Sequence, residues 1–198
     1  INEDFLAGKY NFNAGDITGK IQNQGTITTP TGGMVYLIAP DIENSGIISS
    51  PKGDVILAAG HSVQLFDSFD PNIAVVVSAP EDKAVNLGQI IAESGKVGIY
   101  GGLITQKGTV SADSAVVGEN GRIFFKATKD VTLDKDSTTS AKKGDIRIFG
   151  GMEDGIVDIA GIIDAYAPYG GDGGFIETSD ACVKVKDTAK VNTLATYG

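Results

Sequence analysis

The 198-residue sequence contains no tryptophan, one histidine and one cysteine. A single cysteine, Cys182, cannot form a disulfide within the chain, so packing and hydrogen bonds must stabilise the fold. No apolar run approaches the roughly 20 residues that a membrane-spanning helix needs, and we therefore expect no transmembrane segment. The first residues have neither a basic nor a hydrophobic region, so we expect any signal peptide to lie upstream of Ile1.

Basic residues are also scarce. The sequence has 25 acidic and 16 basic residues, which gives a formal net charge of −9 at pH 7. Nucleic acids and anionic membranes bind surfaces on which lysine and arginine are clustered. We therefore expect no nucleic-acid partner.

Glycine, in contrast, is abundant. The chain has 27 glycines, and 41% of its residues are hydrophobic. This composition is too hydrophobic for a disordered chain and lacks the regular glycine spacing of collagen. It predicts many tight turns between short strands.

The sequence repeats itself with a period of 20 or 21 residues, because segment 33–39 returns as 53–59 and segment 21–27 returns as 42–48. A fixed period of this size is typical of stacked repeat architectures. Aligning the remaining chain on this period predicts one row of inward-facing residues: Val35, Val55, Val75, Val97, Ile123, Ile146 and Ile176.

Two further columns follow the same register. Glycines stand two positions before the inward row, where we expect backbone angles that a side chain would disfavour: Gly33, Gly53, Gly95, Gly121 and Gly144. Amides stand two positions before a second set of glycines, and we predict that they form a hydrogen-bonded structural ladder: Asn23, Asn44, Asn86 and Gln106.

These patterns predict an all-β fold, a parallel β-helix (solenoid) of about eight turns with three short strands in each turn. We treat residues 1–198 as a single domain cut from a longer rod, with corner insertions at 66–72 and 152–174. The stretch around residues 65–84 is either a further turn of the coil or a hairpin that projects from it. The position of Val75 in the inward row favours the coil.

The outward side of the aligned strand is strongly apolar. A contiguous exposed apolar area tends to mark an interface. Either another part of the chain or another molecule must cover it. The candidate interface residues are Tyr36, Ile38, Ile56, Tyr100, Phe124 and Phe149.

Candidate catalytic residues are few. Polysaccharide-cleaving enzymes need neighbouring carboxylates or a base beside a cation. Asp154, Asp158 and Asp164 lie near the second insertion without a basic partner close in sequence, and His61 follows a glycine at a corner. We interpret all four as turn residues in contact with solvent, and we expect no enzymatic activity.

We also predict no metal site and no cofactor. Gly170–Gly174 resembles one copy of a calcium-binding glycine-aspartate repeat, which functions only in several copies. The same glycines lack the Lys and Ser or Thr of a phosphate-binding loop. Cys182 is expected to point outward beside Lys184 and Lys186, without a base or a second cysteine to make it reactive.

Several segments of the sequence, taken together, resemble two-partner secretion exoproteins of the filamentous-haemagglutinin type. The resemblance covers most of the chain and is strongest before about Ala127, in segments 2–12, 23–27, 33–40, 43–46, 57–60, 77–80, 86–88 and 118–123. These segments resemble the later half of the family's secretion and haemagglutination domain and the start of the shaft that follows it.

This resemblance implies a right-handed parallel β-helix within a large secreted adhesin of Gram-negative bacteria. An outer-membrane barrel transporter exports such proteins by recognising the secretion domain. The family's Asn-Pro-Asn motifs, which bear on export, do not occur in this sequence. The resemblance thus implies a fragment that folds as the family does without directing its own secretion.

We therefore hypothesise a non-enzymatic adhesin or structural rod, secreted or held at the bacterial surface, that presents binding surfaces to a receptor which the sequence does not identify. A first alternative is a filament subunit that self-associates end to end or laterally. A second alternative is a polysaccharide-degrading enzyme.

Overall fold

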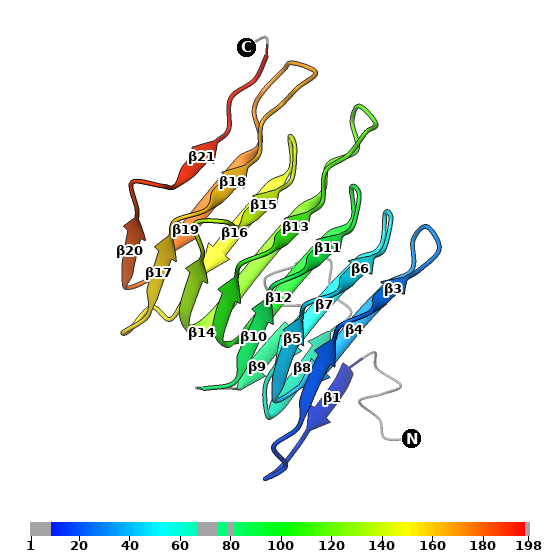
Figure 1. Cartoon of the computed structure of the whole chain (residues 1–198), viewed down its shortest axis with the longest axis vertical. Coiled ribbons are helices and arrows are strands. Elements are labelled where there is room, and N and C mark those ends of the chain that lie inside the picture. The colour runs from blue at the N-terminus through cyan, green and yellow to red at the C-terminus, as the bar shows by residue number, and fades with distance from the viewer. Residues whose placement is uncertain (1–8, 67–74, 79–80, 197–198) are drawn as a thin grey trace.

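The computed structural model describes residues 9–66, 75–78 and 81–196. These residues form strands and turns, with no helix among them. Most strands lie side by side in a stack that follows the order of the chain (Figure 1). Hydrophobic side chains from the parallel sheets of this stack point inward and form one continuous core.

The largest sheet is parallel and has eleven strands. Two of them, β12 and β14, are long and pass through a bend in the stack. The members of this sheet are β2 (Lys20–Asn23), β4 (Met34–Ala39), β5 (Asp41–Asn44), β7 (Asp54–Ala59), β10 (Lys83–Asn86), β12 (Lys96–Gln106), β14 (Arg122–Leu133), β16 (Asp145–Phe149), β17 (Ile156–Ile159), β19 (Phe175–Ser179) and β20 (Cys182–Val185).

The second sheet is also parallel and has seven strands of three residues each. In these strands the middle side chain points toward the core and the two flanking side chains point outward, although Ser140 in the fifth strand is also buried. The members are β3 (Thr26–Thr28), β6 (Ile47–Ser49), β11 (Gln89–Ile91), β13 (Thr109–Ser111), β15 (Thr138–Ser140), β18 (Ile162–Asp164) and β21 (Lys190–Asn192).

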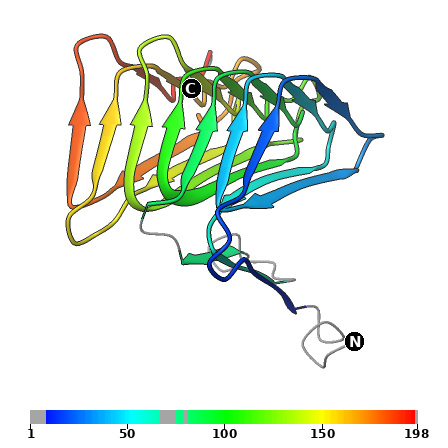
Figure 2. The same ribbon diagram turned by 60° about the horizontal axis from the view of Figure 1, so that its bottom comes forward.

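The third sheet is antiparallel and contains β1 (Lys9–Asn13), β8 (Ser62–Phe66) and β9 (Val75–Ser78), with β8 in the middle. It lies outside the parallel stack, below the stacked strands in Figure 2. Residues 67–72, most of the first expected insertion, lie outside the described part of the chain.

Equivalent positions of successive repeats pair directly in the parallel stack. Val35 pairs with Val55, and Val55 pairs with Val97. The row continues through Ile123, Ile146 and Ile176. Except for Ile176, which is partly buried, these side chains are buried in the core. Branched apolar side chains stacked on one another exclude water along the whole row, which stabilises the pairing of the strands that carry them.

The predicted fold class, a right-handed parallel β-helix of about eight turns with three short strands per turn, is wrong. The strands form sheets of eleven, seven and three members, and the smallest sheet is antiparallel. The largest sheet joins stretches that were expected to be separate, because β12 and β14 continue through their bend with a register shift between Gly101 and Leu103. An irregularity of this kind bends a strand without ending it.

The prediction that Val75 belongs to the inward row is also wrong. Val75 lies in β9 and pairs antiparallel with Leu65 of β8, so the chain leaves the stack after β7 and returns at β10. β7 pairs with β12 instead. The 20-residue spacing of Val75 could not distinguish the two arrangements, because an antiparallel strand that packs on the outside of the stack also needs branched apolar residues.

The glycine column has a different cause from the one predicted. Gly53 and Gly95 do not have positive φ angles; positive values occur one residue earlier, at Lys52 and Ser94. A Cβ atom on Gly53 would overlap the carbonyl oxygen of Gly33, and one on Gly95 would overlap that of Gly53. Glycine is therefore required because the backbones of successive corners approach each other closely.

Candidate functional site

The amide column forms a chain of side-chain hydrogen bonds through the stack. Asn23 Nδ2 donates to Asn44 Oδ1 at 2.7 Å, and Asn44 Nδ2 donates to Asn86 Oδ1 at 2.8 Å. Asn86 Nδ2 donates to Gln106 Oε1 at 2.8 Å. The side chains of Asn44, Asn86 and Gln106 are buried, so these bonds satisfy polar groups that water cannot reach.

The ladder ends at Gln106, whose Nε2 donates to the backbone carbonyl oxygens of Gly108 and Thr138. The next residues in the column are Leu133 and Ile159, which pack in the core. The column therefore changes from amide to apolar along the stack. The ladder fixes the register of the first strands and offers no free group to a ligand.

The apolar outward face is covered by the chain itself. The candidate residues Tyr100 and Phe124 are buried in a second hydrophobic cluster with Val63, Leu65 and Val75 of the antiparallel sheet. Three further candidates pack against this cluster: Ile38, Ile56 and Phe149. The sixth candidate, Tyr36, lies outside the cluster with a relative exposure of 42%. Of the two alternatives left open by the sequence, coverage by the chain's own strands accounts for five of the six residues.

Aromatic rings provide much of the contact between the stack and the antiparallel sheet. The ring centroids of Tyr100 and Phe124 lie 5.9 Å apart, and those of Phe124 and Phe149 lie 5.4 Å apart in an edge-to-face arrangement. Burial raises the pKa of the Tyr100 hydroxyl well above its usual range, with a smaller contribution from the charge of Asp54. Tyr100 is therefore a neutral packing residue in this cluster.

His61 and Asp82 join the two ends of the segment that leaves the stack. The His61 Nδ1 and Asp82 Oδ2 atoms lie 2.6 Å apart, and because a carboxylate only accepts, the imidazole N–H is the donor. The backbone oxygens of both residues also accept hydrogen bonds, from Ala14 and from Gly102 and Leu103. The sequence interpretation of His61 as a solvated turn residue missed this contact; the only signal was its position at one end of the irregular segment.

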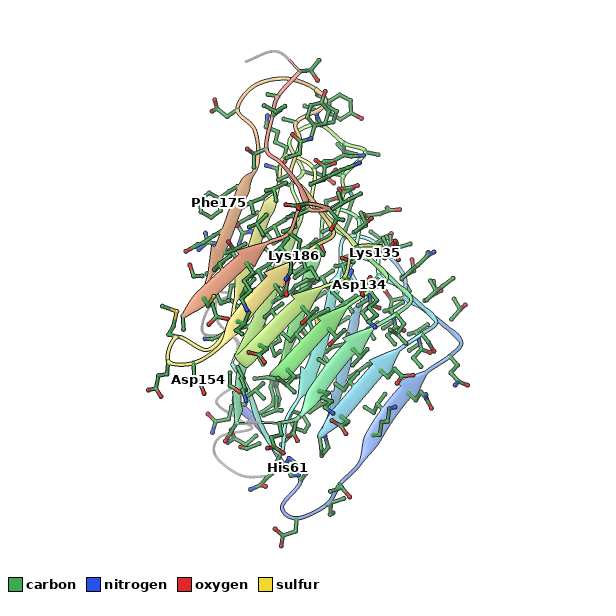
Figure 3. The ribbon with its side chains drawn as sticks, turned by 60° about the vertical axis from the view of Figure 1, so that its left-hand side comes forward. His61, Asp134, Lys135, Asp154, Phe175 and Lys186 are labelled. Carbon is green, nitrogen blue, oxygen red and sulfur yellow. The ribbon has the colours of Figure 1, made fainter. Side chains whose placement is uncertain are left out.

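The three candidate carboxylates do not converge. Asp158 on β17 pairs with Lys186 at 3.1 Å, whereas Asp164 on β18 accepts hydrogen bonds from the Tyr166 backbone and Asn192. Asp154 projects from the loop between β16 and β17, apart from Lys186 (Figure 3). The three residues thus lie on two different sheets and a loop, and two of them are held by structural partners.

A fourth carboxylate, Asp180, has an unusual environment that the sequence did not reveal. Its Oδ2 atom is buried and has no hydrogen-bond partner within the described residues, while Oδ1 accepts from the Ala181 backbone at 2.6 Å. Desolvation raises the pKa of this carboxyl, and the charges of Asp130 and Asp154 add to the rise against the lowering effect of the Ala181 hydrogen bond.

The remaining candidates form no assembled site. Gly170 and Gly171 have positive φ angles in the loop after β18, and Cys182 is an exposed free thiol. Across residues 9–66, 75–78 and 81–196, no group of three or more His, Cys, Asp or Glu side chains is arranged to hold a metal ion. The same residues include no helix with the length and apolarity to cross a bilayer.

Comparison with known proteins gives one type of match. No protein-family model and no curated protein sequence matches the chain. The structure is similar to the crystal structure of the HMW1 secretion domain from Haemophilus influenzae, with a TM-score of 0.82 and 25% sequence identity. The match covers 98% of this chain and 56% of that chain, so this chain spans little more than half the length of the secretion domain. Over nearly its whole length, then, the chain is similar in fold to part of a bacterial secretion domain.

Proposed function

We propose that the chain is part of a secreted two-partner exoprotein, which a dedicated outer-membrane transporter exports to the cell surface or the medium. The observation that carries this proposal is the structural similarity to the HMW1 secretion domain over 98% of the chain. The sequence segments that resemble filamentous-haemagglutinin exoproteins support the same function. They extend over most of the chain.

Within this exoprotein the chain acts as a structural and adhesive module without enzymatic activity. The same geometry recurs from repeat to repeat, with a continuous core and a ladder of buried amides. Such a regular structure suits a stiff support for binding surfaces. Of the three candidate carboxylates, Asp158 and Asp164 engage in structural contacts on different sheets. Filament formation and polysaccharide degradation stay predictions of the sequence that no described contact favours.

The antiparallel sheet is the feature that departs most from a regular stack. It interrupts the repeats, packs on the outside of the core, and exposes the side chains of Tyr10 and Phe12 with relative exposures of 40% and 44%. Exposed aromatic residues on an added layer are typical of recognition surfaces. We place the contact with the transporter on this sheet.

Localisation of the natural gene product tests the proposal. In the producing bacterium, antibodies against this chain should detect it at the cell surface or in the medium. Deletion of the transporter gene should leave it in the periplasm. The variant Phe12→Ser in the natural gene should reduce export, whereas Val117→Ser, at an exposed site away from this sheet, should not. Equal export with and without the transporter would contradict the proposal.

A further inference from the structure

The seven-stranded sheet has an outward surface that the antiparallel sheet leaves uncovered, because the latter packs on the eleven-stranded sheet. The middle residues of its strands, such as Ile48, Ile90 and Val110, are buried in the core. The flanking residues form two parallel columns on the outside, except that Ser140 at one end is buried and its hydroxyl donates to Asp113 Oδ1. In the five strands β3, β6, β11, β13 and β15 these residues are Thr26, Thr28, Ile47, Ser49, Gln89, Ile91, Thr109, Ser111, Thr138 and Ser140.

The ten side chains of this surface, which we call the hydroxyl face, are uncharged, and Asp113 borders the face through its hydrogen bond with Ser140. In a chain with 21% charged residues, about two of ten surface positions would be charged on average, and surface positions are usually richer in charge than the core. Charged side chains also lie on the two strands beyond it, with Asp164 on β18 and Lys190 on β21. An uncharged face on a molecule with a net charge of −9 favours an uncharged partner over any charged polymer.

The dimensions of the hydroxyl face exclude a large protein interface. Strands of three residues, spaced by about 4.8 Å, give a strip roughly 20 Å long and roughly 10 Å wide, on the order of 200 Å². A stable contact between two proteins buries about 800 Å² on each partner. A second copy of this chain would therefore gain too little area here. A single extended polymer chain laid along the stack would fit.

The chemistry of the hydroxyl face matches that of a sugar chain. The hydroxyls of Thr26, Thr109 and Thr138 make no hydrogen bond within the described part of the chain, so they can donate to and accept from a ligand. Between them, Ile47 and Ile91 offer exposed or half-buried apolar surface. Sugar rings combine hydroxyls at their edges with C–H groups on their faces, and therefore need both kinds of contact.

The spacing between strands of the hydroxyl face also matches the geometry of a sugar chain. Where hydroxyl-bearing residues are register partners on adjacent strands, they lie about 4.8 Å apart, which is close to the length of one sugar unit in an extended β-linked chain. Thr109 of β13 pairs in register with Thr138 of β15, so successive sugars would meet equivalent groups. From charge, size, hydrogen-bonding capacity and repeat, we propose that the hydroxyl face binds an uncharged, extended polysaccharide chain that lies along the stack.

Binding of short neutral sugars to the unmodified chain tests this proposal. Cellohexaose, mannohexaose and xylohexaose are uncharged β-linked chains, and isothermal titration calorimetry should detect binding of at least one of them. Because the contacts involve no ion pair, the affinity should change less than about twofold between low and high salt. If none of the three sugars binds, the proposal is wrong.

A pair of matched variants locates the site. Thr109→Lys places a charge in the middle of the hydroxyl face and should weaken binding at least tenfold. Thr105→Lys makes the same change four residues earlier on β12, at a similarly half-buried outward position of the other parallel sheet, and should leave the affinity within about twofold. Thr138→Lys serves as a second variant on the hydroxyl face. Thermal unfolding of each variant identifies loss of structure, and an equal effect of Thr105→Lys and Thr109→Lys would overturn the proposal.

Discussion

Asn44 donates a hydrogen bond from Nδ2 to Oδ1 of Asn86 at 2.8 Å, although 42 residues separate them in the sequence. The neighbouring bonds of the ladder join residues 21 and 20 positions apart. The doubled interval accommodates the segment that leaves the stack and forms β8 and β9. The Asn44–Asn86 hydrogen bond thus joins the strand before the segment that leaves the stack to the strand after it.

Replacing Asn44 tests the stabilising role of this ladder. Asn44→Ala removes one partner from both Asn23 and Asn86 and leaves buried polar groups unsatisfied, so we expect the free energy of unfolding to fall by about 3 kcal/mol. Gln89→Ala, at an exposed amide of the next repeat in the stack, should change it by less than about 0.5 kcal/mol. Urea denaturation measures both values. Similar small losses would show that the ladder contributes little.

Glycines of one column should differ sharply in their tolerance of a methyl group. A Cβ on Gly46 would overlap the carbonyl oxygen of Gly25, whereas a Cβ on Gly25 would meet nothing within 4 Å. We therefore expect Gly46→Ala to reduce the free energy of unfolding by about 3 kcal/mol and Gly25→Ala to change it by less than about 1 kcal/mol. Thermal or urea unfolding of the two variants, run side by side, measures the difference. If both variants were equally stable, close backbone approach would not explain the column.

Phe124 connects the parallel stack to the antiparallel sheet. Its side chain is buried against Tyr100 and Phe149, so Phe124→Ala should create a cavity and cost about 3–5 kcal/mol. It should also increase proteolytic cleavage within residues 60–82, because the cluster anchors that segment. Tyr169→Ala, at a residue with 60% exposure, is the control and should alter neither property. An unchanged cleavage pattern in Phe124→Ala would argue against the anchoring role.

The raised pKa of Asp180 predicts a distinct dependence of stability on pH. The folded protein binds a proton more tightly at Asp180 than the unfolded chain does, so stability falls as pH rises from the ordinary value of 3.8 through the raised folded-state pKa. Asp180→Asn removes this loss, and the variant should be more stable than the original at pH 7 but not below pH 3.8.

The control for this pH dependence is a carboxyl with the opposite shift. Hydrogen bonds from Lys20 and Gln22 lower the pKa of Glu43, so its stabilising contribution is present above the ordinary value of 4.5 and is lost as pH falls. Glu43→Gln should therefore reduce stability at neutral pH and lose this effect in acid. Urea unfolding at a series of pH values measures both variants, and parallel pH profiles would contradict the assigned cause at Asp180.

Residues whose role depends on the repeat could be predicted from the sequence. Val35, Val55 and Val97 stack in register, and Asn44 meets Asn86, because a parallel stack places equivalent positions next to one another. The period of the sequence therefore identifies these contacts without any knowledge of how the strands are grouped into sheets.

Features that interrupt the repeat could not be predicted in the same way. Val75 has the spacing of a stacked strand, yet its apolar side chain is equally suited to the outer cluster with Phe124. The hydrogen bond between His61 and Asp82 depends on where the chain leaves and rejoins the stack, which the period does not encode. The bend within β12 likewise depends on a local register shift at Gly101 rather than on a residue type that marks a strand end.

Disulfide trapping tests most directly whether the chain leaves the stack between β7 and β10. In a Cys182→Ser background, the pair Glu43→Cys and Val85→Cys places thiols on residues that are direct register partners in β5 and β10. Parallel neighbours at about 4.8 Å lie within the Cα separation that a disulfide allows. The alternative, an uninterrupted 21-residue period, would instead place Gln64 beside Glu43. We predict rapid oxidation of the 43–85 pair and none of a 43–64 pair made with Gln64→Cys; preferential formation of the 43–64 disulfide would contradict the fold and the sites derived from it.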